Sequence, residues 1–263
     1  MFWLYEDDVP AGASAERFGA VHLAYLAVFL ILTVCYGFFC RKLDKGRRKK
    51  ADRILGSAVL LCGLFEYGVT ALIGRFSRYT LPIHLCSLLF MLTPIHAWTN
   101  SARPGSFAAR LHAFLGAVLF HPGLPGVWAA LLFPDWMDVP FWHYLSVSGF
   151  LAHGLVSVYA ASILVKNAEA PDPTGLLRRD LRDSVVFMAV GALLMFLFDR
   201  ATGTNYWFMA RPSVGSPFSV AYEGGGYGAY LLAYACATAL VTALCYGLRF
   251  LFLRGREKKR TGA

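Results

Sequence analysis

A histidine and a cysteine stand two residues apart in one of the most apolar stretches of the chain, LPIHLCSLLFML (81–92). A neutral imidazole costs free energy in hydrocarbon, and a thiol brings a reactivity that packing does not require. A thiol within reach of an imidazole can act as a nucleophile, because the imidazole takes the proton and the sulfur attacks an acyl carbonyl. His84 and Cys86 therefore raise the hypothesis of acyl transfer through a thioester.

Two later histidines can supply the base. His143 and His153 stand in PFWHYLSVSGFLAHG (140–154). On an ideal helix their side chains project about 80° apart, so one helix can present them to different neighbours. Spacing alone leaves both as candidates for the catalytic base.

Further polar residues stand near the ends of apolar segments and can orient the base or bind substrate; they are Glu66, Asp199, Asn205, Tyr206 and His22. Each also has a structural interpretation. Glu66 and Asp199 can each belong to an ion-paired structural brace, Asp199 for example with Arg200 or Arg75. Asn205 and Tyr206 can order a loop. Cys86 itself can be a small buried hydrophobic residue, since free cysteines are common inside proteins.

The composition indicates a membrane protein. Of the 263 residues, 57% are hydrophobic and 16% charged, with a mean hydropathy of +0.51, whereas soluble domains carry roughly 25% charged residues. The net charge of +9 comes largely from RKLDKGRRKKADR (41–53) and RGREKKR (254–260), which flank apolar runs. Basic residues placed there indicate anchoring at a membrane surface, so we expect a lipid bilayer and no nucleic acid as partner.

Apolar runs of about 20 residues predict an all-α, polytopic membrane helix bundle of about seven transmembrane helices in a single domain, residues 1–263. The predicted spans cover roughly 19–40, 54–74, 80–99, 107–133, 142–165, 184–203 and 227–253. HPGLPG (121–126) predicts a break in the fourth span, because prolines and glycines interrupt helices. A six-span bundle without that segment is the alternative.

Basic residues also predict the orientation. The first connection, 41–53, holds eight Lys and Arg residues, whereas LFPDWMDVPFW (132–142) holds none. Alternation of basic and non-basic connections predicts an outside N-terminus and a cytoplasmic C-terminus in the cell (inner or plasma) membrane. In this topology the candidate residues gather in the outer half of the membrane, which predicts a polar cavity open to the outer leaflet.

Other classes of site are less well supported. The six cysteines form no CxxC pair, so we expect no disulfide framework, metal site or cofactor. The alternative function is a small-molecule or proton-coupled transporter in which the buried His, Glu and Asp set relays protons. The oligomeric state stays open.

LPIHLCSL (81–88), PFWHYLSVSGFLAHG and GTNYWFMARP (203–212) occur in an order and spacing that resembles the YwaF-like bacterial integral membrane family. That family is related to the eukaryotic transmembrane-protein-164 acyltransferases and, more distantly, to the androgen-induced-gene lipid hydrolases. The resemblance runs from about His22 to Pro212 and implies a membrane-embedded lipid acyltransferase or lipid ester hydrolase that forms an acyl-enzyme.

The resemblance also implies roles for particular residues. Cys86 matches the cysteine of the motif and would be the nucleophile. His153 is favoured as base over His143, because a His-Gly pair also lies on the active-site helix of the hydrolases. His84, with the polar residues named above, would support a membrane lipid or acyl-lipid substrate.

Overall fold

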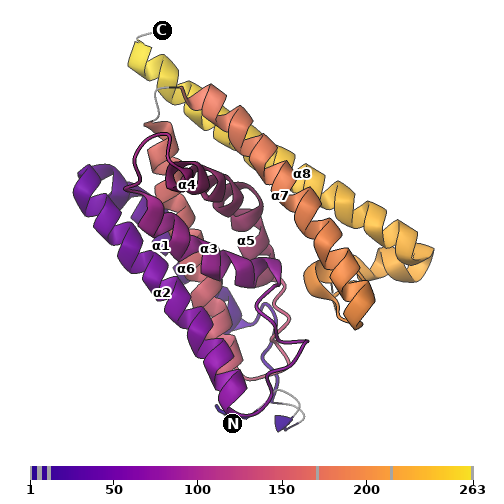
Figure 1. The fold of residues 1–263 in the computed structure, drawn as a ribbon. Helices are drawn as coiled ribbons and strands as arrows, with labels where there is room; N and C mark the ends of the chain where they lie inside the picture. Colours follow the sequence, from indigo (N-terminus) through magenta and orange to yellow (C-terminus); the bar gives the residue numbers. More distant parts are fainter. Residues whose placement is uncertain (1, 5–7, 11–12, 170–171, 214–215, 262–263) are drawn as a thin grey trace.

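The computed structural model describes residues 2–4, 8–10, 13–169, 172–213 and 216–261, and all regular secondary structure in these residues is helical (Figure 1). The elements are α1 (Ala20–Lys42), α2 (Lys45–Leu72), α3 (Leu85–Thr99), α4 (Phe107–Val118), π-helix η2 (Leu119–Gly123), α5 (Leu124–Leu132), α6 (Tyr144–Ala168), α7 (Pro173–Thr202), 3-10 helix η3 (Tyr206–Phe208) and α8 (Ser219–Thr261). Six helical runs in this part, with α4–η2–α5 as one, are long and apolar enough to cross a membrane. The predicted all-α membrane bundle is confirmed.

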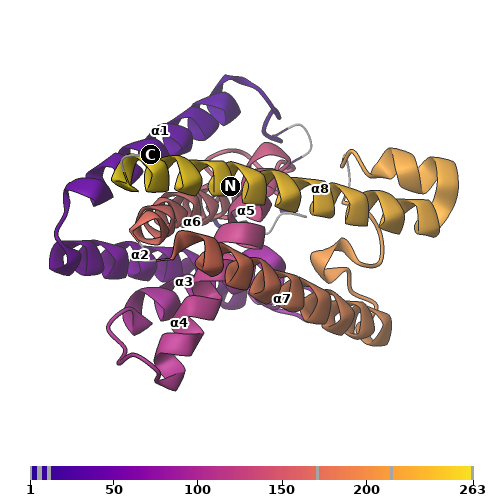
Figure 2. The ribbon, with the colours of Figure 1, turned by 90° about the horizontal axis from the view of Figure 1, so that it is seen from above.

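Helix α6 lies at the centre of the bundle and packs against α1, α2 and α5 (Figures 1 and 2). Its sequence is rich in Ser, Ala and Gly, and small side chains let helices approach closely in lipid. The closest approach is at Gly154, where an added Cβ would lie 2.1 Å from Cδ1 of Phe29 on α1. The glycine of the His153–Gly154 pair is therefore required for α1 to cross α6.

Helices α7 and α8 run side by side at the edge of the molecule and lean away from the bundle near α8's first turns (Figure 1). A buried ion pair holds them together farther along, where Nη2 of Arg249 lies 2.7 Å from Oδ2 of Asp180. Arg249 also contacts His121 in η2, and its guanidinium lies 4.8 Å from the centre of the Phe120 ring. Charge paired in this way is tolerated inside a membrane and ties α8 to α7 and to the π-helix.

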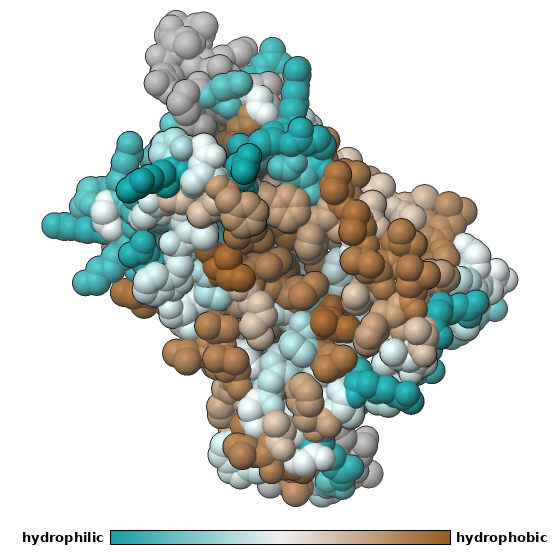
Figure 3. Space-filling view, viewed as in Figure 1, coloured by the Kyte–Doolittle hydropathy of each residue, from teal (hydrophilic) through white to brown (hydrophobic). Residues whose placement is uncertain are grey.

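Apolar side chains cover much of the visible surface, while hydrophilic residues gather mainly toward its ends (Figure 3). Large exposed hydrophobic residues lie on α1, α2, α7 and α8, including Ile31, Leu61, Leu193 and Leu240. A surface of this kind fits a lipid environment, as expected of a multi-pass membrane protein. Which face lies outside stays a prediction.

The six-span alternative is wrong about which segment is left out: residues Phe107–Leu132 are long enough to span, whereas the third predicted span is the short one. Helix α3 begins only at Leu85 and has 15 residues, because residues 74–84 form turns in which Ser77 and Thr80 hydrogen-bond each other and Pro82 follows. The predicted break at HPGLPG is not a gap in the helix. Pro122 lies in a π-helix, whose different hydrogen-bond pattern accommodates the missing N–H of proline, and the helical run continues.

The α1–α6 crossing gives a testable consequence. Gly154→Ala places a methyl group inside the Phe29 ring, and overpacking of this kind costs about 1–3 kcal/mol. We expect a clear fall in the thermal unfolding temperature of the detergent-purified protein. Gly68→Ala on α2 is the control, since its added Cβ meets nothing within 4 Å. Equal unfolding temperatures for the two variants would contradict the crossing.

Candidate active site

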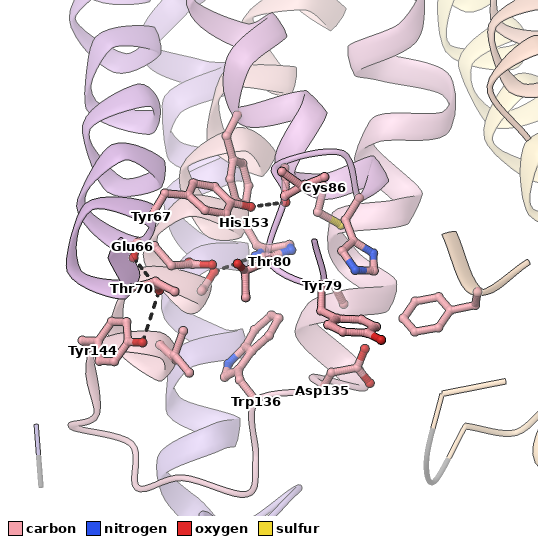
Figure 4. A pocket seen from close by; sticks show the side chains of 18 residues that line it. Glu66, Tyr67, Thr70, Tyr79, Thr80, Cys86, Asp135, Trp136, Tyr144 and His153 are labelled. Carbon is pink, nitrogen blue, oxygen red and sulfur yellow. Dashed lines mark hydrogen bonds between the residues drawn. The ribbon is translucent and has the colours of Figure 1, made fainter. Parts of the chain in front are cut away.

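A cavity of about 310 Å³ opens between α2, α3, α6 and the 133–143 loop (Figure 4). It brings together four of the residues that the sequence singled out: Glu66, His84, Cys86 and His153. Figure 4 shows the side chains of Cys86, His153 and Trp136 around this space. The other lining residues include Tyr67, Thr70, Tyr79, Thr80, Ser87, Asp135, Tyr144 and Phe208.

Cys86 is the second residue of α3, two residues after the N-cap residue His84. The first backbone N–H groups of a helix have no partner within it, and the first helical bond here runs from Leu88 N to His84 O. The His84 side chain makes no capping hydrogen bond. The N-terminus of α3 therefore offers N–H groups and a positive dipole end that stabilise negative charge on sulfur or on a nearby oxygen.

His153 is oriented as a base. Its Nδ1 lies 2.7 Å from the Gly149 carbonyl oxygen, which can only accept, so Nδ1 carries the proton in the neutral ring. The lone pair is then on Nε2, to which none of the described residues hydrogen-bonds. The ring is held between Phe90 and Trp136, with ring centroids 5.1 and 4.9 Å away.

Polar side chains from α2 and α6 form a further wall of the cavity. Oε2 of Glu66 accepts a hydrogen bond of 2.8 Å from the Ser148 hydroxyl. The Thr70 and Tyr144 hydroxyls lie 3.2 Å apart, and the Tyr67 hydroxyl donates to Ser87 Oγ at 2.6 Å. This side of the cavity suits a polar group of a ligand.

The structure does not bring His143 or His22 to the cavity. Nε2 of His143 donates to the Leu4 carbonyl at 2.7 Å, and its Nδ1 accepts from Leu145 N at the start of α6. Nε2 of His22 donates to the Leu131 carbonyl at 2.7 Å, and its Nδ1 accepts from Phe18 N at 2.9 Å. Both rings are fully buried with both nitrogens engaged, which is a packing role.

Asp199, Asn205 and Tyr206 also lie outside the cavity lining and instead fold the loop beside it. Oδ1 of Asp199 accepts from Thr204 Oγ1 at 2.7 Å and from Tyr206 N at 2.8 Å. The Asn205 side chain hydrogen-bonds the backbone of residues 210 and 211. These contacts order residues 204–211.

The same loop supports the segment that leads into α3. The Tyr206 hydroxyl donates to the Arg78 carbonyl at 2.8 Å and accepts from Leu81 N at 2.9 Å. The Tyr206 ring lies 4.6 Å from the His84 ring, and Trp207 Nε1 donates to the Ile83 carbonyl at 2.9 Å. Residues 204–211 do not line the cavity beside Cys86 as a group, but Tyr206 and Trp207 fix the position of the N-terminus of α3, on which Cys86 lies.

The sequence did not single out Asp135 and Trp136, which line the cavity from the 133–143 loop. Desolvation raises the pKa of the Asp135 carboxyl, and a hydrogen bond from Ser213 opposes this. Nε1 of Trp136 is buried and has no hydrogen-bond partner among the described residues, so it can donate to a ligand. The sequence feature that could have pointed to these two residues is an Asp-Trp pair inside a largely apolar loop. No group of three or more potential metal ligands is assembled in the described part of the chain.

The loop contacts give a second prediction. Tyr206→Phe removes the hydroxyl that joins Arg78 and Leu81, a loss of about 1 kcal/mol and thus about fivefold faster local opening. Hydrogen exchange followed by mass spectrometry is expected to show faster exchange in the segment before α3. Tyr222→Phe, at an exposed tyrosine, is the matched control. Unchanged exchange in Tyr206→Phe would show that this segment does not depend on the loop.

Comparison with known proteins adds one finding. Residues 17–246 match the model of the TMEM164 family, a range that contains all the cavity residues described above. No curated protein and no solved structure gave a match. The resemblance to transmembrane-protein-164 relatives is thus confirmed, whereas the YwaF-like and androgen-induced-gene relationships stay predictions. Since the match covers most of its length, the chain belongs to the TMEM164 family.

Proposed function

We propose that this protein is a membrane-embedded lipid acyltransferase or lipid ester hydrolase that works through an acyl-Cys86 intermediate. The observation that carries the proposal is that Cys86 and His153 line one cavity, with the Nδ1 proton of His153 fixed on the Gly149 carbonyl. Nε2 is then the nitrogen that can accept the thiol proton. A thiol, a correctly protonated imidazole and a helix N-terminus together form the arrangement that nucleophilic cysteine chemistry needs.

In the first half-reaction the Cys86 thiol passes its proton to Nε2 of His153, and the sulfur attacks the ester carbonyl carbon of a lipid. The negative charge that develops on the carbonyl oxygen is stabilised by the N–H groups at the start of α3. The carbon–oxygen bond of the ester then breaks, and the leaving alcohol takes the proton from His153. The product is a thioester at Cys86.

In the second half-reaction an acceptor hydroxyl, or water, gives its proton to Nε2 of His153 and attacks the thioester carbonyl. The carbon–sulfur bond breaks, and the thiol recovers its proton. A lipid hydroxyl as acceptor gives acyl transfer and water gives hydrolysis. The polar wall of Glu66, Thr70 and Tyr144 can bind the acceptor or the headgroup.

The thioester is directly testable. The detergent-purified protein is incubated with phospholipid and its intact mass is measured. We expect an added acyl mass that neutral hydroxylamine removes and that Cys86→Ala abolishes. Cys62→Ala is the control, since Cys62 lies outside the cavity lining on α2. An unmodified protein with every lipid class would favour the transporter alternative.

The two histidines can be separated by their variants. A missing general base lowers the rate by about 10²–10⁴-fold, so His153→Asn is expected to slow acylation of Cys86 to that extent while the protein stays folded. His143→Asn breaks the contact to Leu4 and is expected to lower the unfolding temperature with a much smaller effect on the rate. The opposite pattern would reassign the base to His143.

A further inference from the structure

A second cavity, of about 370 Å³, lies between α5 and α8 and meets the first at Cys86. The two cavities share six of their lining residues: His84, Cys86, Ala130, Asp135, Trp136 and Phe208. Cys86 therefore stands where two spaces of different character join. One has a polar wall, and the other, apart from the shared His84 and Asp135 and from Ser213 and Ser216, is lined by apolar and aromatic side chains.

The wall on α5 is made of small residues. Gly126, Ala129 and Ala130 are spaced i, i+3 and i+4, which puts them on one helix face, and all three line the second cavity. A Cβ added at Gly126 would lie 3.6 Å from Cδ2 of Leu85, an ordinary contact. The absence of larger side chains on this face leaves the space open.

The opposite wall, on α8, is aromatic and well fixed. Tyr230 is fully buried, and its hydroxyl donates to the Phe208 carbonyl. Tyr234 lies one turn farther along α8, and its ring centroid is 5.5 Å from that of Phe218. Aromatic rings on one side, with Phe218 and Tyr234 packed edge to face, and small side chains on α5 line a largely apolar slot, which suits a flexible hydrocarbon chain.

The lining residues on α5 extend away from the 133–143 loop. Helices α5 and α8 run in opposite directions (Figure 1). Gly126 lies in the first turn of α5, at the end of that helix away from the 133–143 loop. Cys86 lies at the loop end of α3, where a lipid ester would be, and Phe133, another lining residue, is 40% exposed. An ester at Cys86 can thus enter laterally and extend its chain toward the bilayer midplane.

We propose that the cavity between α5 and α8 holds the acyl chain of the substrate, and that the small residues on α5, Gly126 above all, set the longest chain accepted. The inference rests on the proposed thioester chemistry and adds the substrate class: esters with one long, unbranched acyl chain. The ester carbonyl lies at Cys86, and the first cavity takes the polar remainder. A larger side chain at Gly126 fills part of the slot along α5, where its Cβ contacts Leu85 and no atom of Cys86 lies within 4 Å of it.

The test uses the full-length protein in detergent with two chromogenic donors, the 4-nitrophenyl esters of butanoic and hexadecanoic acid. Acylation of Cys86 is followed by release of nitrophenol and by intact mass. Each buried methylene is worth about fourfold in rate, so Gly126→Leu is expected to lower the long-to-short ratio by more than about tenfold. Ala129→Phe is an independent second variant, and Ala189→Phe, on the exposed face of α7, is the control.

The outcomes separate the inference from the function on which it rests. A lowered ratio in Gly126→Leu or Ala129→Phe, with butanoyl transfer kept and Ala189→Phe unchanged, supports the slot. Wild-type ratios in both variants would overturn the chain-length assignment while leaving the thioester chemistry intact. Equal losses for both esters in both variants would also overturn it. If the wild-type protein shows no acyl mass with either donor, the proposed function itself fails.

Discussion

Inside a bilayer every polar atom must find its partner within the protein, because hydrocarbon offers none. Much of this structure follows from that constraint. His22 and His143 use both ring nitrogens on neighbouring groups, and His96 pairs with the Tyr159 hydroxyl at 2.7 Å. Arg249 is paired with Asp180 across α7 and α8.

Against this background, the groups without partners stand out. Several buried side-chain atoms have no hydrogen-bond partner within the described residues, and most of them, such as Nδ1 of His121 and the Asn100 amide, lie away from the cavity. Nε1 of Trp136 and Nε2 of His153 are two unpartnered nitrogens on residues that line it. Unsatisfied polar groups cost stability, and proteins tolerate them chiefly where a ligand completes the set. The position of these two nitrogens beside Cys86 is one of the reasons for proposing this cavity as the active site.

The shortened third helix creates this site. If residues 74–84 continued the helix, Cys86 would be an interior residue with its backbone N–H engaged. The turns at 74–84 instead place a helix start beside the thiol, and Tyr206 and Trp207 hold the turns in position. The small residues on α5 then leave the second cavity open at the same point. The candidate acyl and polar spaces thus meet at one sulfur atom.

The sequence by itself determined the membrane class, the number of helical segments and the identity of Cys86 and His153 as candidates, since hydropathy and residue type are local properties. Tertiary structure decided which candidates share a cavity. His143 and His153 have the same chemistry. Both ring nitrogens of His143 form hydrogen bonds, with Leu4 and Leu145, whereas His153 bonds only to Gly149 through Nδ1 and its Nε2 has no partner among the described residues. Asp135 and Trp136 gain their position only when the 133–143 loop packs over α3 and α6. Contacts between segments distant in the chain are set by packing, and no local pattern records them.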